Sequence, residues 1–331
     1  MAGSKALRKI QWGDEATAGT PVAASAIWRG MGVIKDEREV VFPEEDVGIL
    51  PGTTRSYLAS QWTQLDLSSV EATFEQLPYI FEAGIATETP TQDGTGSGYV
   101  YNYVASTTSQ NTIRTYTIEG GDDQQAEEFD YAYVSDFTLS GDGQGALMVE
   151  ATWMGRETTN TTFTAAIGLP TVEEIRVNDA SLYIDNSGGT VGSTAVSSTL
   201  KGLTLTVDTG HQHYWAVDGT LDFSATKDVG AEIVLEMQYE HNASAVTEKA
   251  KYRDQSIRLV RLDFEGSSLA TSGTYSKKTL RIDLAGVYED WSVLEDEDGN
   301  DYVTATLRCR YSSADTLFAD FTVVNELSAL P

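Results

Sequence analysis

The sequence predicts a mainly β protein made of two tandem β-sandwich units, each with one short helix. Three observations lead to this prediction. Apolar and polar residues alternate along most of the chain, turn residues separate the alternating segments, and the two halves repeat one order of elements. Successive side chains of a strand point to opposite faces, so a period of two is typical of half-buried strands. The length of 331 residues suits about two domains.

The predicted strands are rich in Val, Ile, Thr and Tyr, which pack well on a pleated surface. Gly- and Asp-rich segments at 141–145 and 298–300 predict turns between them. The clearest alternating segments are residues 38–42, 99–104, 112–118, 136–140, 146–153, 200–207, 220–224, 232–239, 256–264, 279–284 and 303–311.

Two segments favour helices instead. In residues 73–85 the apolar residues recur near helical spacing, and Gly84 is a plausible stop. The second helix is predicted at about residues 243–253, where Glu248 and Lys251 are close enough in sequence to pair.

The order of elements predicts a duplication. In each half an extended segment leads into the helix, and strands, a Gly- or acid-rich turn and a long strand follow. Residues 112–120 resemble 256–266, and residues 137–141 resemble 282–286. Two unrelated β domains, or one large domain, are the alternatives. The predicted division is an N-terminal arm (1–22), a first unit (23–166), a second unit (171–320) and a C-terminal tail (321–331).

The composition excludes several classes of function. The chain carries 50 acidic and 22 basic residues, for a formal net charge of -28, which repels nucleic acid and anionic membranes. We find no apolar run of the length of a signal peptide or a membrane helix, so we expect synthesis in a cytoplasm. The single cysteine, Cys309, excludes an internal disulfide framework.

No pattern indicates catalysis. His211, His213 and His241 lack thiolate or carboxylate neighbours at metal spacing, and residues 295–301 lack the Gly and Glu positions of an EF-hand loop. We therefore predict no catalytic residue, no metal and no cofactor. The acidic clusters are interpreted as an acidic surface or the lining of a lumen, and they comprise Asp122, Asp123, Glu127, Glu128, Glu295, Asp296, Glu297 and Asp298.

Three segments resemble a known family. Residues 13–22 (GDEATAGTPV) are similar to the opening of many tail tube (major tail) proteins of long-tailed phages, where a G-x-E-x-x-x-G-T segment precedes the first strand. Residues 77–81 look like their short helix, and residues 134–156 look like their closing hairpin, which ends in W-x-G-R. The resemblance covers the first half; the second half follows by architecture.

The resemblance implies a structural virion protein without enzymatic activity. The inner strands of such a protein would join those of neighbouring copies in a barrel of about twenty-four strands. Barrels of sixteen to eighteen strands already enclose a channel, so a barrel of this size would be wide enough for duplex DNA. With two units per chain, a trimeric ring is expected in preference to a hexamer. Stacked rings would form a negatively lined conduit through which double-stranded DNA passes without specific binding during ejection. The family also implies a tape-measure protein and tail terminator or tip proteins as partners, no membrane, and a place in the virion tail after synthesis in the bacterial cytoplasm.

An acidic segment broken by Pro and Gly is the predicted contact between rings, together with the two termini; a mobile loop with frayed ends is the alternative. Its candidate residues are Pro43, Glu44, Glu45, Asp46, Ile49, Leu50 and Pro51.

The 16 tyrosines and 6 tryptophans among the strands motivate a different function, a carbohydrate- or receptor-binding β-sandwich module of a virion or cell surface.

Overall fold

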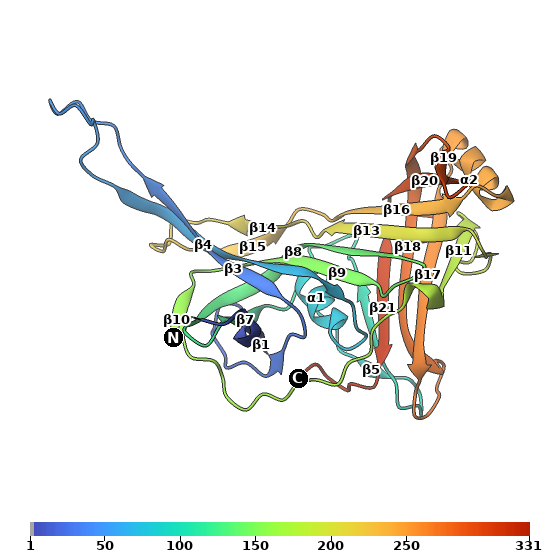
Figure 1. Ribbon diagram of the computed structural model, residues 1–331, viewed down its shortest axis with the longest axis horizontal. Helices are drawn as coiled ribbons and strands as arrows, with labels where there is room; N and C mark the ends of the chain where they lie inside the picture. Colours follow the sequence, from blue (N-terminus) through green and yellow to red (C-terminus); the bar gives the residue numbers. More distant parts are fainter. Residues whose placement is uncertain (1–2) are drawn as a thin grey trace.

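The computed structural model describes residues 3–331, apart from the side chain of Glu297, and its architecture is mainly β (Figure 1). Strands hold 49% of the residues, a large antiparallel sheet dominates, and two short α-helices accompany it. This confirms the mainly β prediction. Within the described residues no sheet closes into a barrel.

The longest run of paired strands, here called the long sheet, contains strands from both halves of the chain. Every neighbouring pair in it is antiparallel, and the halves meet where β8 pairs with β13. In spatial order its strands are β3 (Gly32–Val41), β4 (Tyr57–Glu71), β9 (Met148–Gly155), β8 (Ala126–Asp142), β13 (Leu200–Asp208), β16 (Glu232–Glu240), β20 (Asn300–Cys309) and β18 (Lys277–Trp291).

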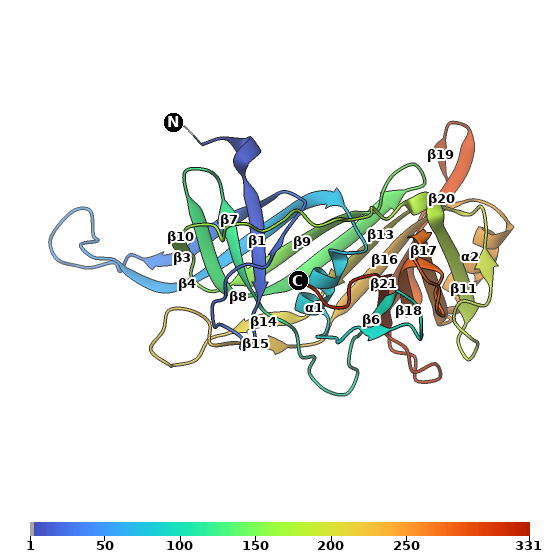
Figure 2. The same ribbon diagram turned by 90° about the horizontal axis from the view of Figure 1, so that it is seen from below.

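Two smaller sets of strands branch from the long sheet. The first is β2 (Ala26–Ile27), β1 (Lys9–Asp14), β7 (Tyr116–Gly121), the start of β8 and β10 (Thr159–Thr161). The second is β12 (Ala195–Val196), β11 (Ala180–Asn186), β17 (Arg258–Ser268), the start of β18, β21 (Ala319–Asn325), β6 (Tyr99–Val104) and β5 (Thr91–Gln92). Figure 2 shows the two sets toward opposite ends of the molecule.

Strands β8 and β18 each serve two sheets because each is interrupted by a bulge. The register of β8 against β9 shifts between Val134 and Asp136, and that of β18 against β20 shifts between Tyr288 and Asp290. A bulge bends a strand and increases its local twist. One half of each strand can therefore pair in the long sheet while the other half pairs in a smaller set.

Helix α1 (Leu77–Gly84) lies under the long sheet, and all of its residues are buried. It begins later than predicted because residues 73–76 form a turn in which the Thr73 hydroxyl accepts a hydrogen bond from the Gln76 N–H at 3.2 Å. Pro78, which has no N–H to leave unsatisfied, occupies the first turn. Phe81 packs against Phe137 and Phe321, so the helix joins the cores of both halves.

Helix α2 (Ala243–Asp254) occupies the predicted position, and its N-cap Asn242 accepts hydrogen bonds from Ser244 and Ala245. The expected pairing of Glu248 with Lys251 is wrong. Glu248 faces the sheet and is only 6% exposed, where it forms a bidentate ion pair with Arg258 at 2.7 and 2.8 Å. A buried carboxylate needs a charged partner that is also buried, and Arg258 supplies one for Glu248.

The terminal segments belong to sheets. β1 lies within the predicted arm, and β21 lies within and just before the predicted tail. Trp12 of β1 and Phe321 of β21 are both fully buried.

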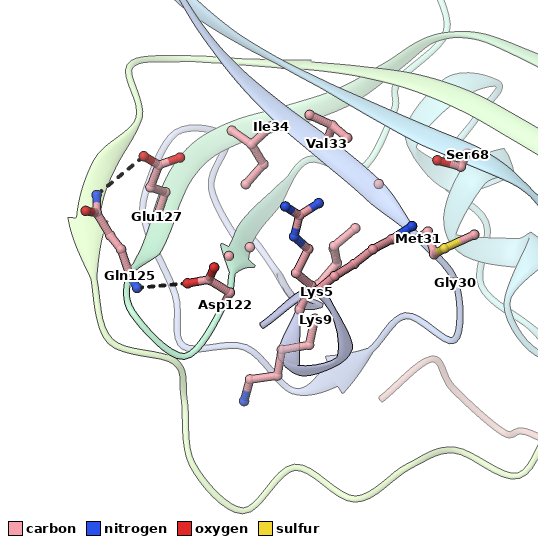
Figure 3. A pocket seen from close by; sticks show the side chains of 15 residues that line it. Lys5, Lys9, Gly30, Met31, Val33, Ile34, Ser68, Asp122, Gln125 and Glu127 are labelled. Carbon is pink, nitrogen blue, oxygen red and sulfur yellow. Dashed lines mark hydrogen bonds between the residues drawn. The ribbon is translucent and has the colours of Figure 1, made fainter. Parts of the chain in front are cut away.

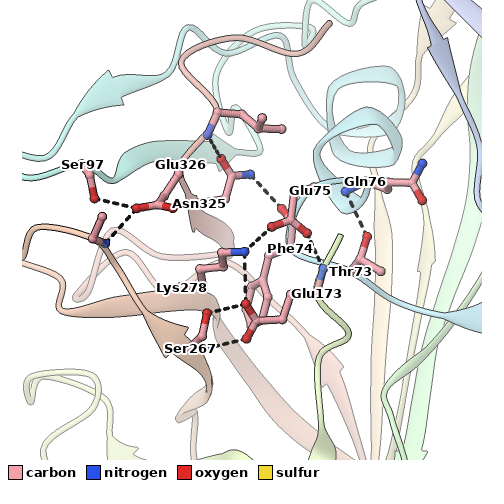
Figure 4. A network of polar contacts seen from close by, with 12 residues as sticks. Thr73, Phe74, Glu75, Gln76, Ser97, Glu173, Ser267, Lys278, Asn325 and Glu326 are labelled. Atoms are coloured by element: carbon pink, nitrogen blue, oxygen red, sulfur yellow. Dashed lines mark hydrogen bonds and ion pairs between the residues drawn. The ribbon is translucent and has the colours of Figure 1, made fainter. Parts of the chain in front are cut away.

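A polar network connects the two halves near the segment that links them (Figure 4). Lys278 of β18 contacts Glu75 at 2.6 Å and Glu173 at 3.1 Å, and the Asn325 side chain of β21 donates a hydrogen bond to the Phe74 carbonyl at 2.8 Å. The remaining elements are η1 (Lys5–Leu7), η2 (Val177–Asp179), β14 (His211–Tyr214), β15 (Ala225–Asp228) and β19 (Glu295–Glu297).

Candidate functional site

The long sheet has one face on the core and one face open to solvent. On the core face, leucines from four neighbouring strands stand in one cross-strand row with no exposed surface: Leu139, Leu205, Leu235 and Leu307. This row runs across the β8–β13 junction without a break. The two halves are thus joined as tightly as strands within either half.

The open face carries a row rich in acid. Asp66, Thr152, Asp136, Asp208 and Glu232 are successive cross-strand partners on β4, β9, β8, β13 and β16. Four of these five side chains are carboxylates. We call this set the acidic row.

Two carboxylates of the acidic row, Asp136 and Asp66, accept hydrogen bonds from neighbouring side chains. The Thr152 hydroxyl donates to Asp136 at 3.0 Å, and the Ser135 hydroxyl donates to the other oxygen of Asp136 at 2.7 Å. Partial burial acts to raise the pKa of Asp66, but the hydrogen bonds from Gln64 and Lys35 outweigh it and leave that pKa below its ordinary value.

Further acids extend this face, and its cations are engaged. Glu150 and Glu236 are exposed between buried neighbours of β9 and β16. Lys35 pairs with Asp66, and Arg308 pairs with Glu232 and, at 2.7 Å, with Glu289. Such a surface attracts cations and repels phosphates.

The acids predicted from charge density lie elsewhere. Asp122 and Asp123 are in the turn between β7 and β8, and Glu127 and Glu128 follow at the start of β8, opposite β10. Glu295, Asp296 and Asp298 belong to the β19–β20 hairpin; the side chain of Glu297 lies outside the described structure. The acidic row was missed because its members are single residues in different strands. Their alternation with buried apolar residues was the available signal.

The predicted ring contact lies in the loop between β3 and β4, at the tip of a hairpin that projects from the body (Figure 1). Leu50 is fully exposed there, and Val47 and Ile49 are about half exposed. Glu45 is held within the loop by Arg55 at 2.8 Å. An apolar tip of this kind is typical of a contact surface.

Each outer strand of the long sheet has one side without a strand partner. Within residues 3–331, β3 pairs only with β4, and the end of β18 pairs only with β20, where Ser292 N–H still donates to the Thr304 carbonyl at 2.8 Å. Beside the β3 edge lies a hollow of about 610 Å³, lined by Ile10, Val33 and Ile34 and by the cations Lys5, Arg8 and Lys9 (Figure 3). Asp122 and Glu127 line its other side. Unpaired sheet edges favour association with another chain.

The segments that resemble tail tube proteins meet in space. Glu15 is buried and accepts hydrogen bonds from Gly19 N–H at 2.8 Å, from the Thr115 and Thr117 hydroxyls at 2.7 and 2.9 Å, and from Tyr131 N–H at 3.0 Å. Gly19 has φ +73, and a Cβ there would collide with the Arg156 guanidinium. Glu15 therefore orders the turn of the first segment, and Gly19 leaves room for the Arg156 side chain at the end of the other.

The histidines do not converge. His211 and His213 lie on β14, and His213 stacks on Phe223 with ring centres 4.4 Å apart; His241 follows β16. Burial lowers the pKa of His213 to about 4. In the described part of the chain, no group of three or more His, Cys, Asp or Glu residues could hold a metal ion. No helix there is long and apolar enough to cross a membrane.

Comparison with known proteins adds no relative. No protein-family model matches the chain, and no curated protein matches it either.

Proposed function

We propose that this protein is a tail tube subunit of a long-tailed phage, a structural protein without catalytic activity that assembles into stacked rings. One observation carries the proposal: the strand pairings of the first half recur in the second, and the halves join edge to edge in the long sheet. Neighbouring chains can join in the same way.

The repetition of pairings supports two copies of one sandwich-like unit. Seven antiparallel pairings have counterparts in the same chain order. In the first half they are β1–β2, β1–β7, β7–β8, β8–β9, β4–β9, β3–β4 and β8–β10. In the second half they are β11–β12, β11–β17, β17–β18, β18–β20, β16–β20, β13–β16 and β18–β21.

Other features agree with this duplication. A 3-10 turn precedes β1 and β11, a helix follows β4 and β16, and the bulges fall at Ser135 and at Glu289. Chance similarity of short β motifs would not align a helix, a bulge and seven pairings together. The predicted boundaries of the units stay predictions.

Each unit contributes four strands to the long sheet, so a chain supplies eight and three chains supply twenty-four. A ring of three chains would pair β3 of one copy with the end of β18 in the next and remove both exposed edges. Barrels of sixteen to eighteen strands already enclose a water-filled channel, so about twenty-four leave room for duplex DNA.

The acidic row suits the wall of a DNA conduit. The core occupies the opposite face of the long sheet, so closure of the ring turns the acidic row toward the lumen. Lys and Arg that contact phosphates bind DNA tightly by releasing counterions. A wall whose cations are already paired with carboxylates keeps DNA mobile, as passage during ejection requires.

Stacking of rings would use the β3–β4 hairpin tip and the ends of the chain, and a head-to-tail contact of this kind builds an open filament. A tape-measure protein, terminator or tip proteins and a location in the virion tail follow from the proposed role. Electron microscopy of the concentrated protein should show rings or hollow tubes. A strictly monomeric species at every salt concentration would overturn the proposal.

The second candidate is a carbohydrate- or receptor-binding module. It is favoured by one aromatic group at the β14–β15 hairpin, where Trp215 is 42% exposed and its ring centre lies 6.4 Å from that of Trp62. Glycans stack on exposed aromatic rings. A glycan array without signal above background would remove this candidate.

A further inference from the structure

We infer that a second copy of this chain docks on the β3 edge in one register: residues 290–295 of one copy lie antiparallel to residues 32–37 of the next, and the acidic β19–β20 hairpin covers the basic hollow beside η1. The inference rests on the proposed ring and adds to it the contacting residues. It is derived from a junction that already exists inside the chain.

That internal junction is the pairing of β8 with β13. Asp136 lies opposite Asp208, Leu139 opposite Leu205, and Gly141 opposite Leu203. If the two halves are copies, the strand that corresponds to β8 must find a partner that corresponds to β13. That partner strand belongs to another copy.

The bulges align β18 with β8. Val134 pairs with Trp153 immediately before one bulge, and Tyr288 pairs with Leu307 immediately before the other. Counting onward, Asp136 corresponds to Asp290 and Leu139 corresponds to Val293. The continuation of β18 past Trp291 is thus the equivalent of the part of β8 that binds β13.

The same count aligns β3 with β13. Trp153 pairs with Leu65, and Leu65 pairs with Ile34; in the second half Leu307 pairs with Leu235, and Leu235 pairs with Leu205. Ile34 therefore corresponds to Leu205. Between copies, Val293 faces Ile34, and Leu294 faces Val33.

The exposure of these residues fits an interface that is missing its partner. Val293 is 78% exposed and Ile34 is only partly buried, whereas Leu139 and Leu205, their counterparts at the internal junction, are fully buried. Leu294 and Val33, each 52% exposed, correspond to the internal pair Ser140 and Thr204. Apolar residues at corresponding positions on both free edges are what self-association would cover.

Charge complementarity points to the same partner. At the internal junction the β8–β9 turn rests on the residues around η2: Val177 N–H donates to the Gly145 carbonyl at 3.1 Å, and Leu147 N–H donates to the Ile175 carbonyl at 2.7 Å. The counterpart of η2 is η1, where Lys5, Arg8 and Lys9 line the hollow of Figure 3.

The counterpart of the β8–β9 turn is the β19–β20 hairpin, which carries Glu295, Asp296 and Asp298. Anionic side chains would then meet Lys5, Arg8 and Lys9 on the side of the hollow that faces away from Asp122 and Glu127. These acids, which the sequence suggested for a surface or lumen, become interface residues in this arrangement.

Disulfide trapping tests the register. In a Cys309→Ala background, the pair Val293→Cys and Ile34→Cys should cross-link between chains in assembled particles under mild oxidation. Directly opposed residues of antiparallel strands have Cα atoms about 4.5–5.5 Å apart, within the range of a disulfide. The matched control pairs Val293→Cys with Glu39→Cys, which is displaced by about 17 Å along β3.

The two sites stand at opposite edges of an eight-stranded sheet, roughly 30 Å apart or more in one chain, so a cross-link must join two chains. Covalent multimers for the first pair, at least tenfold more abundant than for the control, support the inference. Rings that form without this difference would refute the register and leave the proposed function standing. If the untagged parent chain forms neither rings nor tubes, both the register and the proposed function are refuted.

A charge swap tests the hollow separately. Lys5→Glu combined with Arg8→Glu should raise the concentration needed for assembly at least tenfold, and adding Glu295→Lys with Asp296→Lys should restore it. Restoration supports the contact between hairpin and hollow. A defect that the swap does not restore, or no defect, would show that the hairpin docks elsewhere.

Discussion

The substitution Val293→Asp should weaken assembly without harming the folded chain. Val293 is 78% exposed, so its replacement should change the free energy of unfolding by less than about 0.5 kcal/mol. Complete burial of a valine contributes about 1.5–2 kcal/mol, and the part that association newly covers contributes somewhat over 1 kcal/mol. A carboxylate without a partner in the interface costs about 1–3 kcal/mol more.

The sum is about 3 kcal/mol for each interface, which raises the concentration needed for assembly by about a hundredfold, because 1.4 kcal/mol corresponds to a factor of ten. Sedimentation velocity over a dilution series measures this concentration, and thermal melting of the dilute chain checks the fold. Val217→Asp is the matched control, since Val217 is fully exposed in the loop between β14 and β15. Assembly of Val293→Asp at the parent concentration would refute the reasoning.

Three further predictions concern stability and pH. Glu248→Gln should lower the free energy of unfolding, measured by urea denaturation, by about 3–5 kcal/mol, because it leaves the buried charge of Arg258 uncompensated. The control Glu265→Gln removes an exposed ion pair and should cost under about 1 kcal/mol. Equal effects of the two substitutions would contradict this. Burial lowers the pKa of His213 to about 4 in the folded chain, against about 6.5 in the unfolded chain. The contribution of neutral His213 to the free energy of unfolding is therefore fully present above pH 6.5. It should fall by about 2 kcal/mol, after discounting for partial exposure, as the pH drops to 4. His213→Phe should remove that part of the pH dependence, and an unchanged slope would show another origin. Low pH or divalent salt should promote assembly by relieving repulsion between carboxylates. For the same reason the Asp136→Asn variant should assemble at a lower salt concentration than the parent chain. Sedimentation that does not change with pH or salt would contradict this prediction.

Local patterns predicted most of the elements because strands and helices are encoded by nearby residues. Residues 220–224, which were predicted as a strand, instead lie in the loop between β14 and β15. The period of two identified strands such as 146–153 and 200–207, and helical spacing identified both helices. The start of α1 was misplaced because the turn at Thr73 depends on a single side-chain hydrogen bond.

Partners distant in the sequence were beyond local reasoning. β21, in a segment read as a tail, pairs with β6 more than two hundred residues earlier, and no local pattern encodes that pairing. The Glu248–Arg258 pair depends likewise on how α2 packs against the sheet. The acidic row depends on the register of five strands, whereas the charge clusters that stood out in the sequence lie in turns.

A projection image down the axis of an assembled particle tests the central idea most directly. We expect a hollow ring of three chains that looks six-fold at low detail, with a pore wide enough for duplex DNA. A compact solitary particle, or an assembly without a central channel, would contradict the proposed tube.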